Sequence, residues 1–190
     1  MIWPKSPFWD YSLRLYGRPG VEAACLALQR RHGVDVNLVL FACWLASLGI
    51  ELDQVTLARA KKAVSDWQLE VIRPLRALRR RLRVRLDHGE PDTIASLWPD
   101  QAEALRRHVL ATELDGEHLA QLALAQVSVD LKPTVPAGAA LASINLTRYW
   151  SFRSDDLHDL RTLLHQAFPK ATPEVLASAL SSIEASDPRP

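Results

Sequence analysis

The sequence has few of the features that mark secreted, metal-bound or membrane-spanning proteins. It contains two cysteines in 190 residues, which excludes a disulfide framework, and Cys25 and Cys43 lack the Cys-x-x-Cys spacing of a redox or metal pair. Both lie in apolar helical patterns, so we expect reduced core residues. The N-terminal residues contain no continuous apolar run of the signal-peptide type. We therefore expect a cytoplasmic protein.

Excess charge and the common active-site motifs are also missing. Lys and Arg number 23 against 22 Asp and Glu, so the total charge indicates neither a nucleic-acid nor a membrane partner. There is no P-loop, Gly-x-Ser-x-Gly or Gly-x-Gly-x-x-Gly. The six histidines do not stand near one another or near cysteine at zinc-site spacing. We expect no metal and no cofactor, and the sequence favours a non-enzymatic protein, with an enzyme as an open alternative.

The strongest positive signal is an apolar stretch near the middle of the N-terminal half. Nine consecutive apolar residues, Leu38 to Ala46, lie between a polar start at Asp35 and a glycine at Gly49. This stretch is shorter than the roughly 20 residues needed to span a bilayer. A helix that is apolar on every side requires neighbours on every side. We therefore expect a helix over residues 35–49 at the centre of a bundle.

The rest of the chain follows helical periodicity, and no long alternation of apolar and polar residues competes with it. We expect Pro74 to kink or break a long pattern from Asp53 to Leu86, and Lys132–Gly138 to be a linker. The prediction is an all-α, single-domain helical bundle at 1–150, wrapped around the central helix. A two-helix extension at 151–190 is expected to pack on the same domain.

Several blocks in the first half of the chain resemble a known family. These are Phe8-Trp9-x-Tyr11-Ser12-Leu13-x-x-Tyr16, Gly20-Val21-x-x-Ala24-Cys25-Leu26-x-Leu28-Gln29 and Gly33-x-Asp35-Val36-Asn37-Leu38-x-Leu40-Phe41-x-x-Trp44-Leu45. They resemble an uncharacterised family of small proteobacterial proteins of about 160 residues, whose closing block resembles Asn145-Leu146-x-x-Tyr149. The family has no assigned activity, so the resemblance implies a bacterial, cytoplasmic, helical protein and no mechanism.

A basic helix is the main functional signal. Residues Arg59 to Arg85 contain ten Lys or Arg and only two acids, Asp66 and Glu70. The candidate partner-binding residues share one helical arc: Arg73, Arg76, Arg79, Arg80 and Arg83. Such a face binds an acidic protein surface or phosphate backbones, or its arginines pair with acids elsewhere in the fold. We expect a protein partner first, and RNA or the ribosome as the alternative.

Two other polar groups are candidates for a site. A ligand pocket or weak acid/base site near the start of the central helix would use Asp10, Gln29, His32, Asp35 and Asn37, although the same residues could simply cap helices. Asp155-Asp156-Leu-His-Asp159 has the Asp-Asp-x-x-Asp form that holds magnesium in isoprenoid synthases. The first turn of a helix also favours such acids through the helix dipole, and we prefer that interpretation. The sequence does not specify the oligomeric state.

Overall fold

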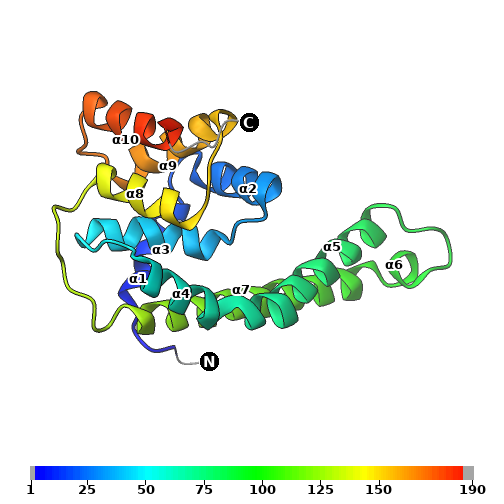
Figure 1. Ribbon diagram of the computed structural model, residues 1–190. Helices are drawn as coiled ribbons and strands as arrows, with labels where there is room; N and C mark the ends of the chain where they lie inside the picture. The colour runs from blue at the N-terminus through cyan, green and yellow to red at the C-terminus, as the bar shows by residue number, and fades with distance from the viewer. Residues whose placement is uncertain (1–2, 186–190) are drawn as a thin grey trace. The chain divides into compact units, whose positions relative to one another are not determined.

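The computed structural model describes residues 3–185, and all regular secondary structure in that range is helical (Figure 1). The helices are α1 (Pro7–Tyr16), α2 (Val21–His32), α3 (Val36–Ser47), α4 (Gln54–Trp67), η1 (Gln68–Ile72), α5 (Arg73–Asp87), α6 (Ile94–Leu97), α7 (Pro99–Val127), α8 (Ala139–Tyr149), η2 (Ser154–Asp156), α9 (Leu157–Ala167) and α10 (Pro173–Ala185). The predicted all-α class is confirmed. None of the described helices is both long and apolar enough to cross a bilayer.

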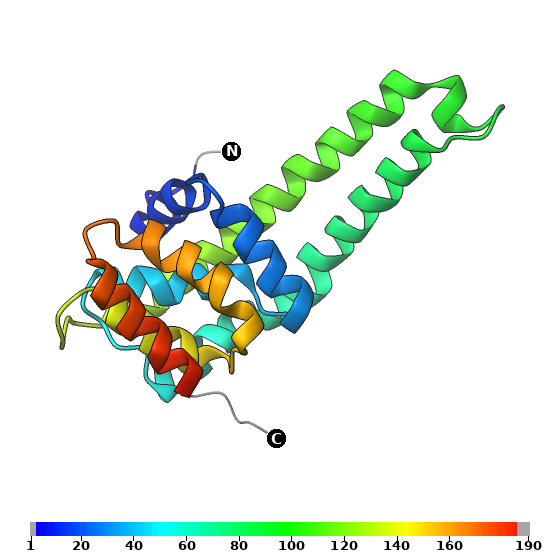
Figure 2. The same ribbon diagram turned by 90° about the horizontal axis from the view of Figure 1, so that it is seen from above.

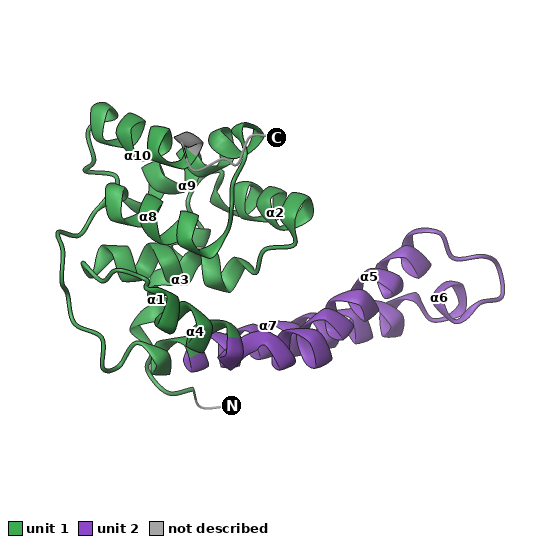
Figure 3. Ribbon diagram, in the orientation of Figure 1, with its two compact units in different colours: residues 1–61, 124–190 green, residues 62–123 purple. Residues whose placement is uncertain are grey.

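The chain divides into two units, shown in green and purple in Figure 3. Unit 1 comprises Met1–Lys61 and Leu124–Pro190, and unit 2 comprises Lys62–Ala123. This division does not coincide with the expected boundary near residue 150. The separation of a bundle at 1–150 from an extension at 151–190 therefore stays a prediction.

Helix α3 is the centre of unit 1, as its apolar run predicts. Asp35 begins it by accepting a hydrogen bond from the Asn37 amide at 2.8 Å, and every residue from Asn37 to Ala46 is buried. The indole of Trp44 stacks on Phe8 of α1, with ring centroids 5.0 Å apart. Helices α1, α2 and α8 all contact α3, so the apolar helix has the surrounding neighbours that its composition requires.

The C-terminal helices belong to the same core. Helix α9 packs on α2, and α10 packs on α8 (Figures 1 and 2). Leu160, Leu163 and Leu164 of α9 have no exposed surface. Asn145 of α8 is equally buried, and its amide group bonds Leu52 N, Ala42 O and Ile50 O at 2.8–3.2 Å. Residues after 124 therefore supply a large part of the interior of unit 1.

Unit 2 is a helical hairpin in which α5 runs back along the first part of α7 (Figures 1 and 2). A π-helical turn, η1, comes directly before Pro74, and the Arg73 amide donates to the Gln68 carbonyl five residues earlier. Proline has no N–H to donate, and its ring clashes with the carbonyl four residues before it. The wider turn is the observed form of the expected interruption at Pro74. Helix α7 continues through Gly116 as one helix.

Candidate functional site

Two of the five predicted partner-binding arginines point toward α7 rather than outward. Arg76 donates from Nε to Glu113 at 3.1 Å and from Nη2 to Glu117 at 2.6 Å. Arg79 Nε lies 2.6 Å from Glu113. The Glu113 side chain is only 7% exposed; burial would raise its pKa, but hydrogen bonds from Arg79 and Arg76 outweigh this and hold the pKa below its ordinary value. Arg76 and Arg79 therefore join α5 to α7 within the hairpin.

The other predicted arginines are exposed. Arg83 Nε lies 3.4 Å from Asp87 in a solvent-exposed pair, which contributes little. Arg73 and Arg80 are exposed and form no ion pair with any described residue. At about 100° per residue, they share an outward arc with Arg81 and Arg85, which are likewise exposed and without an ion pair in the described chain. We call Arg73, Arg80, Arg81 and Arg85 the outer arginine face.

Arg81 and Arg85 lie outside the arc of the five predicted arginines and were not identified from the sequence. Helix α5 contains no buried residue, so a wider arc of it meets solvent. The sequence does contain a sign of the acidic partners of Arg76 and Arg79. Glu113 and Glu117 are four residues apart, so they lie on one side of α7.

Apolar side chains are also exposed in unit 2. Val84 lies on the outward side of α5 and is 59% exposed, and Ile94, at the start of α6, is 77% exposed. Leu97 and Trp98 at the end of α6 are more than half exposed. Large exposed apolar residues together with arginine are typical of protein interfaces.

The predicted ligand-pocket residues are only partly brought together. Gln29 donates to the Val34 carbonyl at 3.4 Å, and Asp35 caps α3, as described above. Asn37 is buried at the start of α3, whereas Asp10 is exposed on α1. Of these five residues, only His32 is among those that line the cleft described below.

His32 is held by a buried carboxylate. Its Nε2 lies 2.7 Å from Asp156, whose side chain has no exposed surface, and Asp156 also accepts from Arg31 Nε and the Arg153 amide, each at 2.8 Å. Burial would raise the pKa of Asp156, but the hydrogen bonds from Arg153, His32 and Arg31 lower it below its ordinary value. An ionised carboxylate only accepts hydrogen bonds, so Nε2 of His32 carries the proton.

Two of the three carboxylates of the Asp-Asp-x-x-Asp segment are paired with cationic side chains of the protein itself. Asp156 and Asp159 both bond Arg31, while Asp155 is exposed. Asp156 also accepts from the Arg153 amide at this helix start, and the favourable interaction of the acids with the helix dipole stays a prediction. In residues 3–185 no three His, Cys, Asp or Glu side chains are grouped to hold a metal ion.

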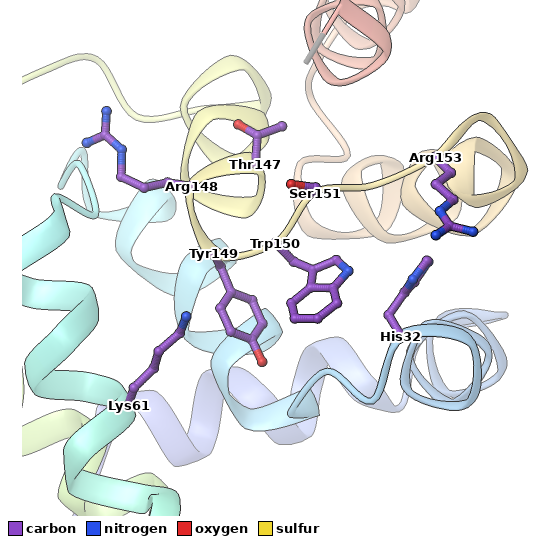
Figure 4. A pocket seen from close by; sticks show the side chains of 8 residues that line it. All are labelled: His32, Lys61, Thr147, Arg148, Tyr149, Trp150, Ser151 and Arg153. Atoms are coloured by element: carbon purple, nitrogen blue, oxygen red, sulfur yellow. The ribbon is translucent and has the colours of Figure 1, made fainter. Parts of the chain in front are cut away.

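A cleft of about 450 Å³ lies within unit 1 (Figure 4). Its lining residues come from α2, α4 and the end of α8 with the segment that follows: His32, Lys61, Thr147, Arg148, Tyr149, Trp150, Ser151 and Arg153. The Tyr149 hydroxyl accepts from the Asp35 amide at 2.8 Å, and burial raises its pKa above the ordinary value. Lys61 Nζ lies 5.4 Å from the Tyr149 ring centre.

The fold and these surfaces define an all-α protein with a charged helical hairpin and a cationic cleft, and neither feature contains an established catalytic arrangement. The chain belongs to the family described as "Protein of unknown function (DUF2390)", whose model matches residues 7–124. No curated protein and no solved structure matches the chain. The matched residues include the hairpin and the whole of α3, but end before α8.

Proposed function

We propose that this protein is a non-enzymatic adaptor or regulatory protein that binds an acidic protein partner through the outer arginine face of α5. The observation that supports this most is that none of these four arginines forms an ion pair with a described residue. Arg76 and Arg79 use Glu113 and Glu117, whereas the four outer arginines are left with solvent. Uncompensated positive charge on one helix face attracts an anionic surface.

A protein partner fits the surface better than phosphate alone. Arg and Trp are enriched in the energetically important parts of protein interfaces, and unit 2 exposes Val84, Ile94 and Trp98 as well as the arginines. Duplex phosphate binding would need the positive charge but not the apolar side chains. RNA binding through the same arginines is the alternative that the experiment must separate.

The test is a tagged pull-down from a lysate of the native organism, with wild type and with Arg80→Glu/Arg81→Glu. Exposed charges contribute only about 0–1 kcal/mol to stability, so the double variant should keep the wild-type melting temperature and lose the partner. The control is Arg30→Glu/Arg161→Glu, which makes the same change in charge at two exposed arginines of unit 1. It should retain the partner. Arg76 and Arg79 are avoided because their reversal would face buried Glu113.

Nuclease treatment and salt distinguish the partner classes. A protein partner should survive nuclease and show a moderate salt response. A nucleic-acid partner should be lost on nuclease treatment, and its binding should weaken with a log–log salt slope of about −0.7 to −0.9 per phosphate contacted. Equal recovery of every partner by wild type and Arg80→Glu/Arg81→Glu would refute a binding role for the outer arginine face.

A further inference from the structure

The cleft of unit 1 has the size of a small-molecule site. Its volume of about 450 Å³ falls within the roughly 300–1,000 Å³ typical of ligand pockets. Segments far apart in the sequence form it: His32 ends α2, Lys61 lies in α4, and residues 147–153 end α8 and follow it (Figure 4). Neither the outer arginine face nor any other part of unit 2 contributes to it.

The cleft carries positive charge that the protein itself leaves unpaired. Lys61 and Arg153 are exposed and form no ion pair with any described residue. Arg148 is held by Glu51 at 2.7 Å. None of the residues lining the cleft is acidic, and the nearest carboxylate behind His32, that of Asp156, is fully buried and already accepts from three donors. An anionic ligand would therefore meet Lys61 and Arg153 without displacing an acid already paired to either of them.

The same cleft has an aromatic wall. Trp150 is 38% exposed, and its ring centre lies 6.1 Å from that of His32. Figure 4 shows the indole between Tyr149 and His32, with its nitrogen edge turned toward the side of Arg153. An exposed indole offers a planar surface on which an aromatic ring stacks, as the bases of nucleic acids stack on such side chains.

His32 adds one polar group of defined orientation. Because Nε2 donates to the Asp156 carboxylate, Nδ1 is the ring nitrogen that has no hydrogen bond to any described residue. A buried carboxylate that fixes an imidazole in this way is a common means of setting the orientation and the tautomer of the ring.

We propose that this cleft binds a small organic phosphate that carries a planar aromatic ring. The phosphate is held by Arg153, since a guanidinium fork suits its several acceptor oxygens. The ring stacks on Trp150, and Nδ1 of His32 is available to a polar group of the ligand. Since the outer arginine face lies in unit 2, this proposal stands or falls separately from the adaptor function.

Titration calorimetry of the full chain with AMP tests the ligand class. Adenosine lacks the phosphate and inorganic phosphate lacks the ring, so AMP should bind about tenfold or more tightly than either. Absence of AMP binding at millimolar concentrations would overturn the proposal. Inorganic phosphate binding as tightly as AMP would overturn the role of the aromatic wall.

Variants locate the site. Arg153→Glu should weaken AMP binding about tenfold or more, and Trp150→Ala should do the same. Arg161→Glu is the matched control, because Arg161 is an exposed arginine of α9 outside the cleft, and it should bind AMP as wild type does. The melting temperatures of Arg153→Glu and Arg161→Glu should equal that of wild type. These two variants therefore keep the test valid if Trp150→Ala unfolds. An equal loss in Arg161→Glu would show that AMP responds only to total charge.

Discussion

At the scale of single residues, the positions that organise unit 1 are buried polar side chains that combine several hydrogen bonds. Asn145 links α8 to the Ala42 carbonyl within α3 and to Ile50 and Leu52 in the segment after α3, so this buried residue of the sequon Asn145-Leu146-Thr147 is unsuited to glycosylation. Asp156 joins the end of α2 to the start of α9 through Arg31 and His32. Removing one partner from such a group leaves others buried and unsatisfied, which is costlier than losing an exposed pair.

The Asp156 interaction predicts a specific pH dependence. Its folded-state pKa lies below the ordinary value, so its contribution to stability is complete above about pH 4–5 and disappears as pH falls through the folded-state pKa. Asp156→Asn should therefore melt at a lower temperature than wild type at pH 7, and the difference should shrink below about pH 4. Calorimetry across pH 2–7 (a range set by the ordinary pKa of about 4) measures this.

Asp155→Asn is the matched control, because it removes the adjacent exposed carboxylate. Its melting temperature should stay close to that of wild type. A difference between wild type and Asp156→Asn that remains constant from neutral to acidic pH would contradict the assigned role of the carboxylate.

At the scale of elements, the linker after α7 is attached to the end of the central helix. The amides of Thr134 and Val135 donate to the Gly49 carbonyl at 2.9 and 3.2 Å, and the Gly138 amide donates to Ala46 at 3.3 Å. Gly49 has a φ of +73°, and a Cβ there would lie 2.5 Å from the Val135 carbonyl oxygen. The proline-rich segment predicted as a linker is therefore an ordered cover over the C-terminus of α3.

Comparing two glycines separates backbone strain from this contact. Gly33 has a similar φ of +67°, but a Cβ there would meet nothing within 4 Å. Gly33→Ala should cost about 1–2 kcal/mol from left-handed strain alone. Gly49→Ala should cost about 1–3 kcal/mol more, because the clash displaces two hydrogen bonds worth about 0.5–1.5 kcal/mol each. Chemical denaturation measures both, and equal losses would show that the linker contact is unimportant.

At the scale of the whole molecule, the family match and the core of unit 1 do not have the same limits. The match ends at residue 124, whereas α8, α9 and α10 follow it and pack within unit 1. Helices α8 and α9, which follow the match, thus bury surfaces of α3 and α2, and α10 packs on both α8 and α9. The cleft also depends on this region, since residues 147–153 form most of its lining.

Deleting residues 151–190 tests whether they are an extension or part of the core. Leu160, Leu163 and Leu164 are fully buried, and removing α9 would expose the apolar surface of α2 that it covers. The deletion also removes the buried side chains of Phe152, Leu180 and Ile183. At about 1.5–3 kcal/mol for each of these six side chains, the loss is comparable to the roughly 5–15 kcal/mol stability of a typical domain. We expect the 1–150 fragment to show no cooperative melting transition by circular dichroism. A cooperative transition near the wild-type temperature would support the extension.

The sequence by itself determined the helical class and the buried central helix with its two ends, because periodicity, caps and breakers act within a few residues of one another. The ends of α3 at Asp35 and Gly49, and the interruption before Pro74, follow from such local chemistry. Only the tertiary structure decided which arginines of α5 face solvent, because Arg76 and Arg79 meet Glu113 across 34 or more residues of chain. It alone also brought His32, Lys61 and Arg153 into one cleft, since residues from three distant segments share a site only after the helices between them have packed.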